Sequence, residues 1–253
     1  GSRISERIPT RAASIFSMAQ GSNATGGELL VEAGGQLTTT GFSFAGNGVP
    51  ADFSAIIQGE GTRWTINQGN SQILGAGTNQ VDFRILGGAV VDSSSSINNW
   101  SIGQGASVLV SGEGTRWLSG GVLNINATTA GQPAGDFIIE NGAAVTVRAN
   151  GLSALGSING PVSRSLIVRS GGELNFTGGN GAGLSVRNGT LTADGGTITG
   201  RLELFGEADR RTLVSVLNGG LIDGTGGGGW SADPETDFLV TGANSRLIAV
   251  GSP

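Results

Sequence analysis

Short apolar runs separated by turn residues form the main pattern along the chain. The runs are rich in Leu or β-branched residues, and Gly, Asn, Ser or Asp bound them, which is typical of β-strands joined by turns. Helical signal is confined to the N-terminus, where Thr10 follows Pro9 and can cap a short helix over 11–20. The pattern therefore predicts an all-β protein with one short N-terminal helix. The runs lie at 29–31, 56–57, 108–110, 138–139, 166–168, 213–217 and 238–240.

A repeat of 53 residues organises these expected strands. The segment Gly59-Glu-Gly-Thr-Arg-Trp64 recurs as Gly112-Glu-Gly-Thr-Arg-Trp117, and Gly242-Ala-Asn-Ser-Arg-Leu247 is a looser third copy. A second motif, in which an apolar residue precedes Gly-Gly or Gly-Ala by three positions, lies about 25 residues from the first. One structural coil therefore has about 25 residues, and two coils make the repeat.

A coil of this length, with two or three short strands, fits one rung of a right-handed parallel β-helix. A rung cannot bury its apolar face alone, so rungs stack about 4.8 Å apart and share one core. We expect roughly ten rungs, on the order of 50 Å in length, over residues 26–253, with an N-terminal segment or cap at 1–25. Glycine suits the corners, where the backbone takes positive φ or packs against the next rung. The glycines expected at corners are Gly34, Gly59, Gly87, Gly112, Gly142, Gly171, Gly219 and Gly242.

The composition excludes several classes of chemistry. There is no His, Cys or Tyr, and all fourteen basic residues are Arg. A His-based triad, a Cys nucleophile, a Lys Schiff base and a zinc site of the usual His/Cys kind are therefore excluded. The net charge of −5 disfavours nucleic acid, and the longest apolar runs fall far short of the roughly 20 residues that span a bilayer. We expect no cofactor, no metal site, no nucleic-acid partner and no membrane insertion.

The repeat resembles the autotransporter-associated repeat, in which Gly-x-x-Ser/Thr-x-Trp/Leu precedes an apolar strand that ends in Val-Gly. The residues that carry this resemblance lie within 53–67, 106–118 and 237–251. The family consists of passenger domains of bacterial type V secretion proteins, which form β-helical stalks and commonly act in adhesion, aggregation or biofilm formation. The resemblance implies a secreted or cell-surface passenger, truncated at its C-terminus, that acts as an adhesin or structural stalk. The implied partners are a host or bacterial surface glycan or protein, or a second passenger.

Five residues at equivalent motif positions are candidates for ligand binding. If they were exposed, they could hold an acidic glycan by bidentate hydrogen bonds and ring stacking. The alternative is structural, with each Trp capping the core at a corner and each Arg paired to Glu60 or Glu113. Positions that repeat within one chain usually serve rung geometry, so we favour the structural alternative. The five candidates are Arg63, Trp64, Arg116, Trp117 and Arg246.

An acidic cluster near the C-terminus supports a second function. Two carboxylates that face each other across rungs could act as acid and base on a glycosidic bond, or several could hold Ca²⁺. The stretch 222–230 resembles pectin-degrading β-helix hydrolases, but the Asn-Thr-Asp segment, the paired Asp-Asp and the catalytic His of that family are missing. A polysaccharide-cleaving enzyme is therefore the less favoured alternative. The cluster consists of Asp223, Asp233, Glu235 and Asp237.

Two segments interrupt the repeat, at 120–135 and 149–162, and contain Pro133 and Pro161. We expect either loops that leave the rod or variable corners. Functional residues on repeat scaffolds are often found in such insertions.

Overall fold

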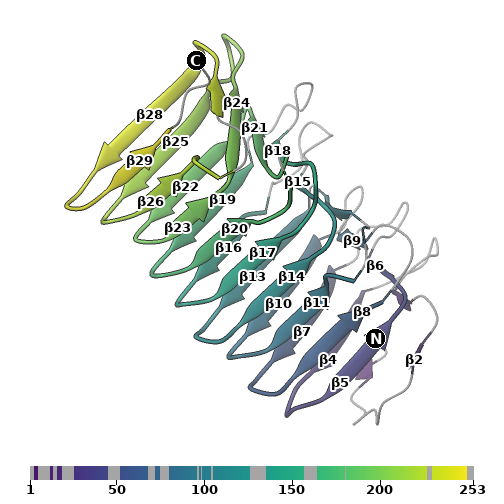
Figure 1. The fold of residues 1–253 in the computed structure, drawn as a ribbon. Coiled ribbons are helices and arrows are strands. Elements are labelled where there is room, and N and C mark those ends of the chain that lie inside the picture. Colours follow the sequence, from purple (N-terminus) through teal and green to yellow (C-terminus); the bar gives the residue numbers. More distant parts are fainter. Residues whose placement is uncertain are drawn as a thin grey trace.

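The strands of this chain stack into a parallel β-solenoid. The computed structural model describes residues 3–4, 12–13, 16–18, 26–44, 52–67, 72–74, 80–95, 97, 99–103, 105–125, 135–156, 164–179, 181–226 and 230–249. Within these residues there are β-strands and no helix. The strands form three parallel sheets that run side by side along one axis (Figure 1). The predicted all-β solenoid is therefore confirmed.

Each of the three sheets takes one strand from each successive rung. Sheet A contains β1 (Arg3–Ile4), β4 (Gly27–Val31), β7 (Asp52–Gln58), β10 (Gln80–Leu86), β13 (Ala106–Ser111), β16 (Phe137–Glu140), β19 (Ser165–Arg169), β22 (Thr190–Asp194), β25 (Thr212–Leu217) and β28 (Thr236–Thr241). Sheet B contains β2 (Ala12–Ala13), β5 (Gln36–Thr39), β8 (Arg63–Ile66), β11 (Val90–Ser93), β14 (Arg116–Ser119), β17 (Ala144–Val147), β20 (Glu173–Phe176), β23 (Thr197–Thr199), β26 (Leu221–Asp223) and β29 (Arg246–Ile248). Sheet C contains β3 (Phe16–Met18), β6 (Phe42–Phe44), β9 (Gln72–Leu74), β12 (Trp100–Ile102), β15 (Leu123–Ile125), β18 (Leu152–Gly156), β21 (Gly183–Arg187), β24 (Arg201–Phe205) and β27 (Trp230–Ala232).

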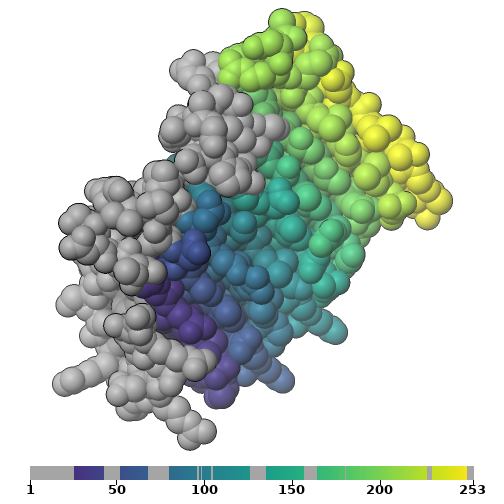
Figure 2. Space-filling view, turned by 180° about the vertical axis from the view of Figure 1, so that it is seen from behind, coloured from purple at the N-terminus to yellow at the C-terminus, as the bar shows by residue number. Residues whose placement is uncertain are grey.

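The strand register explains the length of the repeat. Val81 on β10 is the Cα partner of Phe53 on one side and of Ala106 on the other. Two rungs therefore separate Phe53 from Ala106, which lie 53 residues apart in the sequence. Viewed from behind, the described rungs form successive bands in sequence order from purple to yellow (Figure 2).

The core lies inside the three sheets and is built by alternation along each strand. On β7, Phe53, Ala55 and Ile57 are buried, whereas Ser54 and Ile56 point outward and are half-buried. Residues that alternate in this way place one apolar face toward the core. From β6 to β16 the core is aromatic, with neighbouring ring centroids 4.5 to 6.4 Å apart. The rings belong to Phe42, Trp64, Phe83, Trp100, Trp117 and Phe137.

The helix predicted over 11–20 is wrong where the structure describes this segment. Ala12–Ala13 forms β2, which pairs with β5, and Phe16–Met18 forms β3, which pairs with β6. Arg3–Ile4, also within the expected cap at 1–25, pairs with β4. Backbone hydrogen bonds to the next rung satisfy these residues, so tertiary pairing outweighs the local capping signal.

The interruptions predicted at 120–135 and 149–162 are partly strands. Leu123–Ile125 forms β15 and Leu152–Gly156 forms β18, and these two strands pair with each other in sheet C. The segments therefore contain rung structure that the motif search overlooked, because sheet C strands are short and follow no repeated motif. Pro133 and Pro161 lie outside the described residues.

Candidate functional site

Two kinds of corner recur between sheet A and sheet B in the described part of the chain. In the short corner, the Gly35 amide donates to the Glu32 carbonyl at 2.9 Å, and the enclosed Ala33 and Gly34 have φ of 54° and 76°. Two successive residues with positive φ are the mark of a type I′ turn, which favours Asn-Gly and Gly-Gly pairs. Equivalent pairs are Gly87-Gly88, Asn141-Gly142, Ser170-Gly171 and Asn218-Gly219.

The glycines predicted at corners all have positive φ, which confirms that placement. At Gly112 a larger residue would also crowd the preceding rung, since a Cβ atom there would lie 3.0 Å from the Gly87 amide nitrogen. The φ values are 76° for Gly34, 93° for Gly59, 59° for Gly87, 104° for Gly112, 76° for Gly142, 76° for Gly171, 83° for Gly219 and 93° for Gly242.

The repeated motif forms the second kind of corner, which is joined to the preceding rung by a hydroxyl group. Thr62 Oγ1 donates to the Gln58 carbonyl at 2.7 Å and accepts from the Gly34 amide at 3.1 Å. Because Gly34 belongs to a short corner, the bond joins one corner type to the other and ties two rungs together. The equivalent amide-to-hydroxyl bonds are Gly88 to Thr115 at 2.8 Å and Gly219 to Ser245 at 3.0 Å.

The two motif tryptophans lie in the core and not on the surface. Trp64 and Trp117 are both fully buried, and each points inward from the first inward-facing position of its sheet B strand. A ligand outside the solenoid cannot stack on either ring. The motif Arg and Trp side chains therefore do not form one exposed binding surface. The two rings pack in the core, as the structural alternative predicts.

The motif arginines lie on the outer face of sheet B, in one row. Arg63 and Arg116 are both Cα partners of Val90, so they flank it on the rungs before and after. Arg246 belongs to the same row but lies five rungs beyond Arg116, roughly 24 Å away at the usual strand spacing. The structure therefore brings Arg63 and Arg116 together and leaves Arg246 apart.

Arg63 pairs with a carboxylate that sequence reasoning did not single out. Its guanidinium donates to Asp92 Oδ2 on the next rung, so the expected pairing with Glu60 is wrong. Among the described residues, Arg116 forms no ion pair, so the expected pairing with Glu113 is not seen either. The signal for Asp92 is weak in sequence, because the contact crosses 29 positions between rungs of unequal length.

Asp92 is the electrostatic centre of this surface. Burial has the largest single effect on the pKa of Asp92, and it raises that pKa. Hydrogen bonds from the Ser94 hydroxyl, at 2.6 Å, and from the Ser94 amide, at 3.0 Å, lower the pKa, and so do the Arg63 and Arg148 guanidiniums. Together these contacts outweigh burial. The net result is that the pKa of Asp92 lies below its ordinary value. Arg116 and Arg148 are exposed, so this patch offers guanidinium groups to solvent around one ionised carboxylate. We call Arg63, Asp92, Arg116 and Arg148 the arginine patch.

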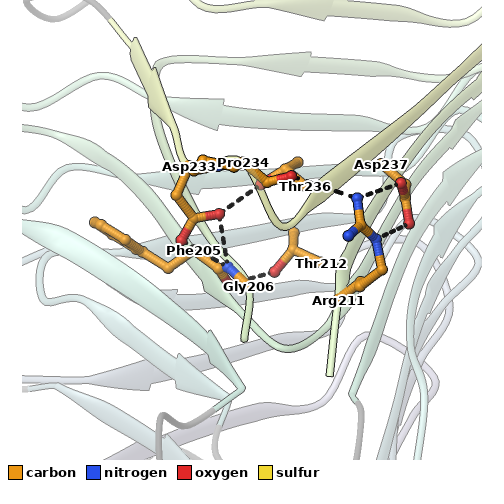
Figure 3. A network of polar contacts seen from close by, with 8 residues as sticks. All are labelled: Phe205, Gly206, Arg211, Thr212, Asp233, Pro234, Thr236 and Asp237. Atoms are coloured by element: carbon orange, nitrogen blue, oxygen red, sulfur yellow. Dashed lines mark hydrogen bonds and ion pairs between the residues drawn. The ribbon is translucent and has the colours of Figure 1, made fainter. Parts of the chain in front are cut away.

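Two carboxylates of the acidic cluster hold local structure (Figure 3). Both oxygens of Asp233 accept from the Gly206 amide, at 3.0 and 2.9 Å, and Oδ1 also accepts from the Thr236 hydroxyl at 3.2 Å. Arg211 donates through Nε and Nη2 to Asp237 at 2.6 and 2.7 Å. These groups join the corner between sheets C and A on neighbouring rungs.

The other members of the acidic cluster do not complete an acid–base pair among the described residues. Asp223 lies on β26 of sheet B and accepts from the Thr225 amide at 2.9 Å, whereas Asp237 lies on β28 of sheet A. Hydrogen bonds from Thr225 lower the pKa of Asp223, and the hydrogen bond from Arg211 lowers the pKa of Asp237. A glycosidase acid needs a raised pKa to hold its proton. Glu235 lies on the turn before β28, and its carbonyl accepts from a backbone amide of the preceding rung.

No metal site emerges from the acidic side chains of the described residues. Within that part of the chain, no three Asp or Glu side chains are grouped so that they could hold a metal ion. The Ca²⁺ alternative for the cluster therefore has no support from its geometry.

Sequence reasoning missed Arg164, the one buried guanidinium among the described residues. Its side chain crosses two rungs, and burial, opposed in part by Asp136, lowers its pKa to about 10, so the group stays protonated at neutral pH. A Cβ atom at Gly135 would lie 2.3 Å from the Ala106 carbonyl oxygen, so glycine lets Gly135 lie close to Ala106, and the carbonyl oxygens of both accept from Arg164. Arg164 thus ties successive rungs from inside. It donates to the carbonyl oxygens of Ile102, Gly103, Ala106 and Gly135.

No helix in the described part of the chain is long and apolar enough to cross a membrane. Comparisons of the chain with protein-family models, with curated proteins and with solved structures each find no match.

Proposed function

We propose that this chain is a β-helical passenger segment of a bacterial cell-surface or secreted protein, acting as an adhesin or a structural stalk. The observation that carries the proposal is the use made of the repeated motif. Its hydroxyl group bonds to the preceding rung and its Trp fills the core, as Thr62 and Trp64 do. A repeat whose side chains hold the rungs together is what a rigid rod requires, and the outer faces of such a rod remain available to partners.

The arginine patch supports the adhesin form of the proposal. Arg116 and Arg148 are exposed, and guanidinium groups bind carboxylates and sulfates by paired hydrogen bonds. An acidic glycan or an acidic protein segment is therefore the partner that sheet B fits.

The outer face of sheet A supports contact between passengers. Leu109, Ile138 and Ile167 are successive Cα partners on β13, β16 and β19, and all three are half-buried on the outer face. Leu30 and Ile56 lie in the same row nearer the N-terminus, where Arg84 separates them from Leu109. Such a row favours side-by-side association of two rods.

Bead binding tests the proposal directly. Beads coated with the whole chain should adhere to surfaces carrying heparin or polygalacturonate, or should aggregate with one another. The double variant Arg116→Gln/Arg148→Gln should weaken adhesion to the acidic surfaces, and Arg201→Gln, whose guanidinium pairs with Glu203 on sheet C, is the matched control. Beads that neither adhere nor aggregate would exclude the adhesin form and leave the stalk. Release of reducing or unsaturated ends from either polysaccharide would instead favour the enzyme alternative.

A further inference from the structure

An open hollow of about 600 Å³ lies on the outer side of sheet A, at the beginning of strands β4, β7, β10 and β13. This volume falls within the range of about 300 to 1,000 Å³ that is usual for small-molecule sites. Neither the repeated motif nor the arginine patch contributes to it. The polar residues that line the hollow are Asp52, Ser54, Gln80, Asp82, Arg84 and Ser107.

The hollow arises from a difference in side-chain size between neighbouring strands. Asp82 on β10 is the Cα partner of Ser54 on β7 and of Ser107 on β13. The two serines are short, so open space is left above them beside the longer side chains of Asp82 and Arg84. Gly27 on β4 also lines the hollow and contributes no side chain.

Asp82 and Arg84 form a bidentate ion pair in the hollow. Arg84 Nε donates to Asp82 Oδ1 at 2.9 Å, and Nη2 lies 2.6 Å from Oδ2. The two side chains are 41% and 46% exposed, so the pair remains open to solvent. Each carboxylate oxygen keeps a further lone pair, and the guanidinium keeps further N–H donors. The pair therefore offers acceptors and donors side by side at one edge.

The remaining polar groups extend this mixture. Asp52 and Gln80 are Cα partners at the start of β7 and β10, and they bring a second carboxylate and an amide. A hydroxyl group both donates and accepts, so a ligand with adjacent hydroxyls can satisfy such a surface. The charged groups of the hollow are two carboxylates and one guanidinium. The excess of negative charge disfavours uronates and sulfated sugars.

We propose that this hollow binds a neutral saccharide unit, with adjacent sugar hydroxyls donating to Asp82 and Asp52 and accepting from Arg84 and Gln80. The inference rests on the adhesin form of the proposed function, and it names a ligand class and a surface for it. The hollow on sheet A and the arginine patch on sheet B then select different ligands by charge.

Ligand-observed NMR on the whole chain tests the inference. The neutral probes are cellotriose, maltotriose, lactose and tri-N-acetylchitotriose, and the acidic probes are trigalacturonate and a chondroitin sulfate hexasaccharide. We expect at least one neutral probe to give saturation transfer that an excess of the same sugar abolishes. If no neutral probe binds, the proposal is overturned.

Variants locate the binding. Asp82→Asn keeps the size of the side chain and removes charge, and it should weaken the neutral probe about tenfold or more, since hydrogen bonds to charged groups are the stronger ones. Ser107→Leu fills the hollow and should weaken binding as much. The matched control is Ser165→Leu, on β19 in the same outer row but outside the hollow, which should change affinity less than twofold. Equal weakening by Ser107→Leu and Ser165→Leu, or none by Asp82→Asn, would overturn the proposed location.

Failure of this inference differs from failure of the proposed function. If beads adhere and the hollow variants adhere equally to a neutral-glycan surface, the hollow is excluded while adhesion stands. If a neutral probe binds in solution and is lost in Ser107→Leu, but beads neither adhere nor aggregate, the saccharide site stands and the adhesin form fails.

Discussion

The two copies of the repeated motif, residues 59–64 and 112–117, have the same six residues and build the same corner. Gly59 and Gly61 have φ of 93° and 76°, and Gly112 and Gly114 have φ of 104° and 77°. In both copies the Thr hydroxyl accepts from a Gly amide on the preceding rung, and the Trp is fully buried. Backbone and core position are therefore shared between the copies.

The copies differ in what their side chains contact on the neighbouring rungs. Trp64 Nε1 donates to Thr39 Oγ1 at 3.1 Å, whereas Trp117 Nε1 has no hydrogen-bond partner among the described residues. Ser93 holds the position equivalent to Thr39, but its Oγ accepts from Trp100 Nε1 at 3.0 Å. The hydroxyl that would satisfy Trp117 is thus already used by another ring. The motif determines the corner, and the adjacent rung determines the partner.

The largest expected effect tests what the copies share. Trp64→Ala and Trp117→Ala should each destabilise the chain by about 3 to 5 kcal/mol, because each removes a fully buried ring from the aromatic core. Denaturant unfolding followed by circular dichroism measures the change. A loss below about 1 kcal/mol in either variant would contradict the placement of that ring in the core.

The next effect tests the hydroxyl bonds between rungs. Thr62→Val and Thr115→Val should each cost about 1 to 2 kcal/mol, since a part-buried amide and carbonyl lose their partner. Hydrogen exchange should accelerate at Gly34 in the first variant and at Gly88 in the second. Thr38→Val, on the outer face of β5, is the control and should stay within about 0.5 kcal/mol of the wild type. Exchange that accelerates at neither glycine would contradict the bonds.

A smaller effect separates the two copies. Trp64→Phe breaks the bond to Thr39, whereas Trp117→Phe removes an N–H that is buried without a partner. We therefore expect Trp64→Phe to cost about 1 kcal/mol more than Trp117→Phe, although the change in ring size is the same. Denaturant unfolding measures the two changes, and the midpoints can be compared where the slopes are equal. Equal losses of unfolding free energy would contradict a contribution of the Trp64–Thr39 hydrogen bond to stability.

The smallest effect concerns the arginines. The lowered pKa of Asp92 means that its ionised form stabilises the fold above its unfolded-state pKa of about 4, and that this stability is lost as pH falls through the lower folded value. Arg63→Gln removes one cause of the lowering and brings the folded pKa nearer to the unfolded value, so the loss should be smaller and should end at a higher pH, with a change under about 1 kcal/mol because the pair is partly exposed. Arg116→Gln should leave the acid profile unchanged. Urea unfolding between pH 6 and pH 2 measures both, and equal shifts in the two variants would contradict the pairing.

The strands of sheet A could be predicted from sequence because they are long enough to show their pattern. The seven apolar runs all fall in sheet A strands, as the 56–57 run does in β7. Strands of sheet C such as β12 and β15 have three residues each, too few for an alternation to be recognised. The N-terminal helix was predicted from capping residues, yet Phe16–Met18 forms a strand because β6 lies beside it.

The candidate site could be predicted less completely than the fold. The motif identified the positions of Arg63 and Trp64, but two adjacent residues on a strand point to opposite sides, and the sequence did not say which one faces the core. Arg164 carries no motif, and the carbonyl oxygens that it bonds, such as those of Gly135 and Ala106, belong to other rungs. The backbone carbonyl groups that satisfy a buried charge can be recognised only once the register is known.

The sequence by itself determined the corners of this protein, the period of its coil and the absence of His, Lys, Cys and Tyr chemistry. The positive φ of the corner glycines and the Thr hydroxyl that closes the corner both belong to residues close together in the sequence, so a motif of six residues is enough to specify them. Only the tertiary structure decided which side chains meet, such as Arg63 with Asp92 and Trp100 with Ser93. The reason is that Cα partners lie 25 residues apart at Val81 and Ala106 but 29 apart at Phe137 and Leu166. A contact between rungs therefore depends on the length of everything between them.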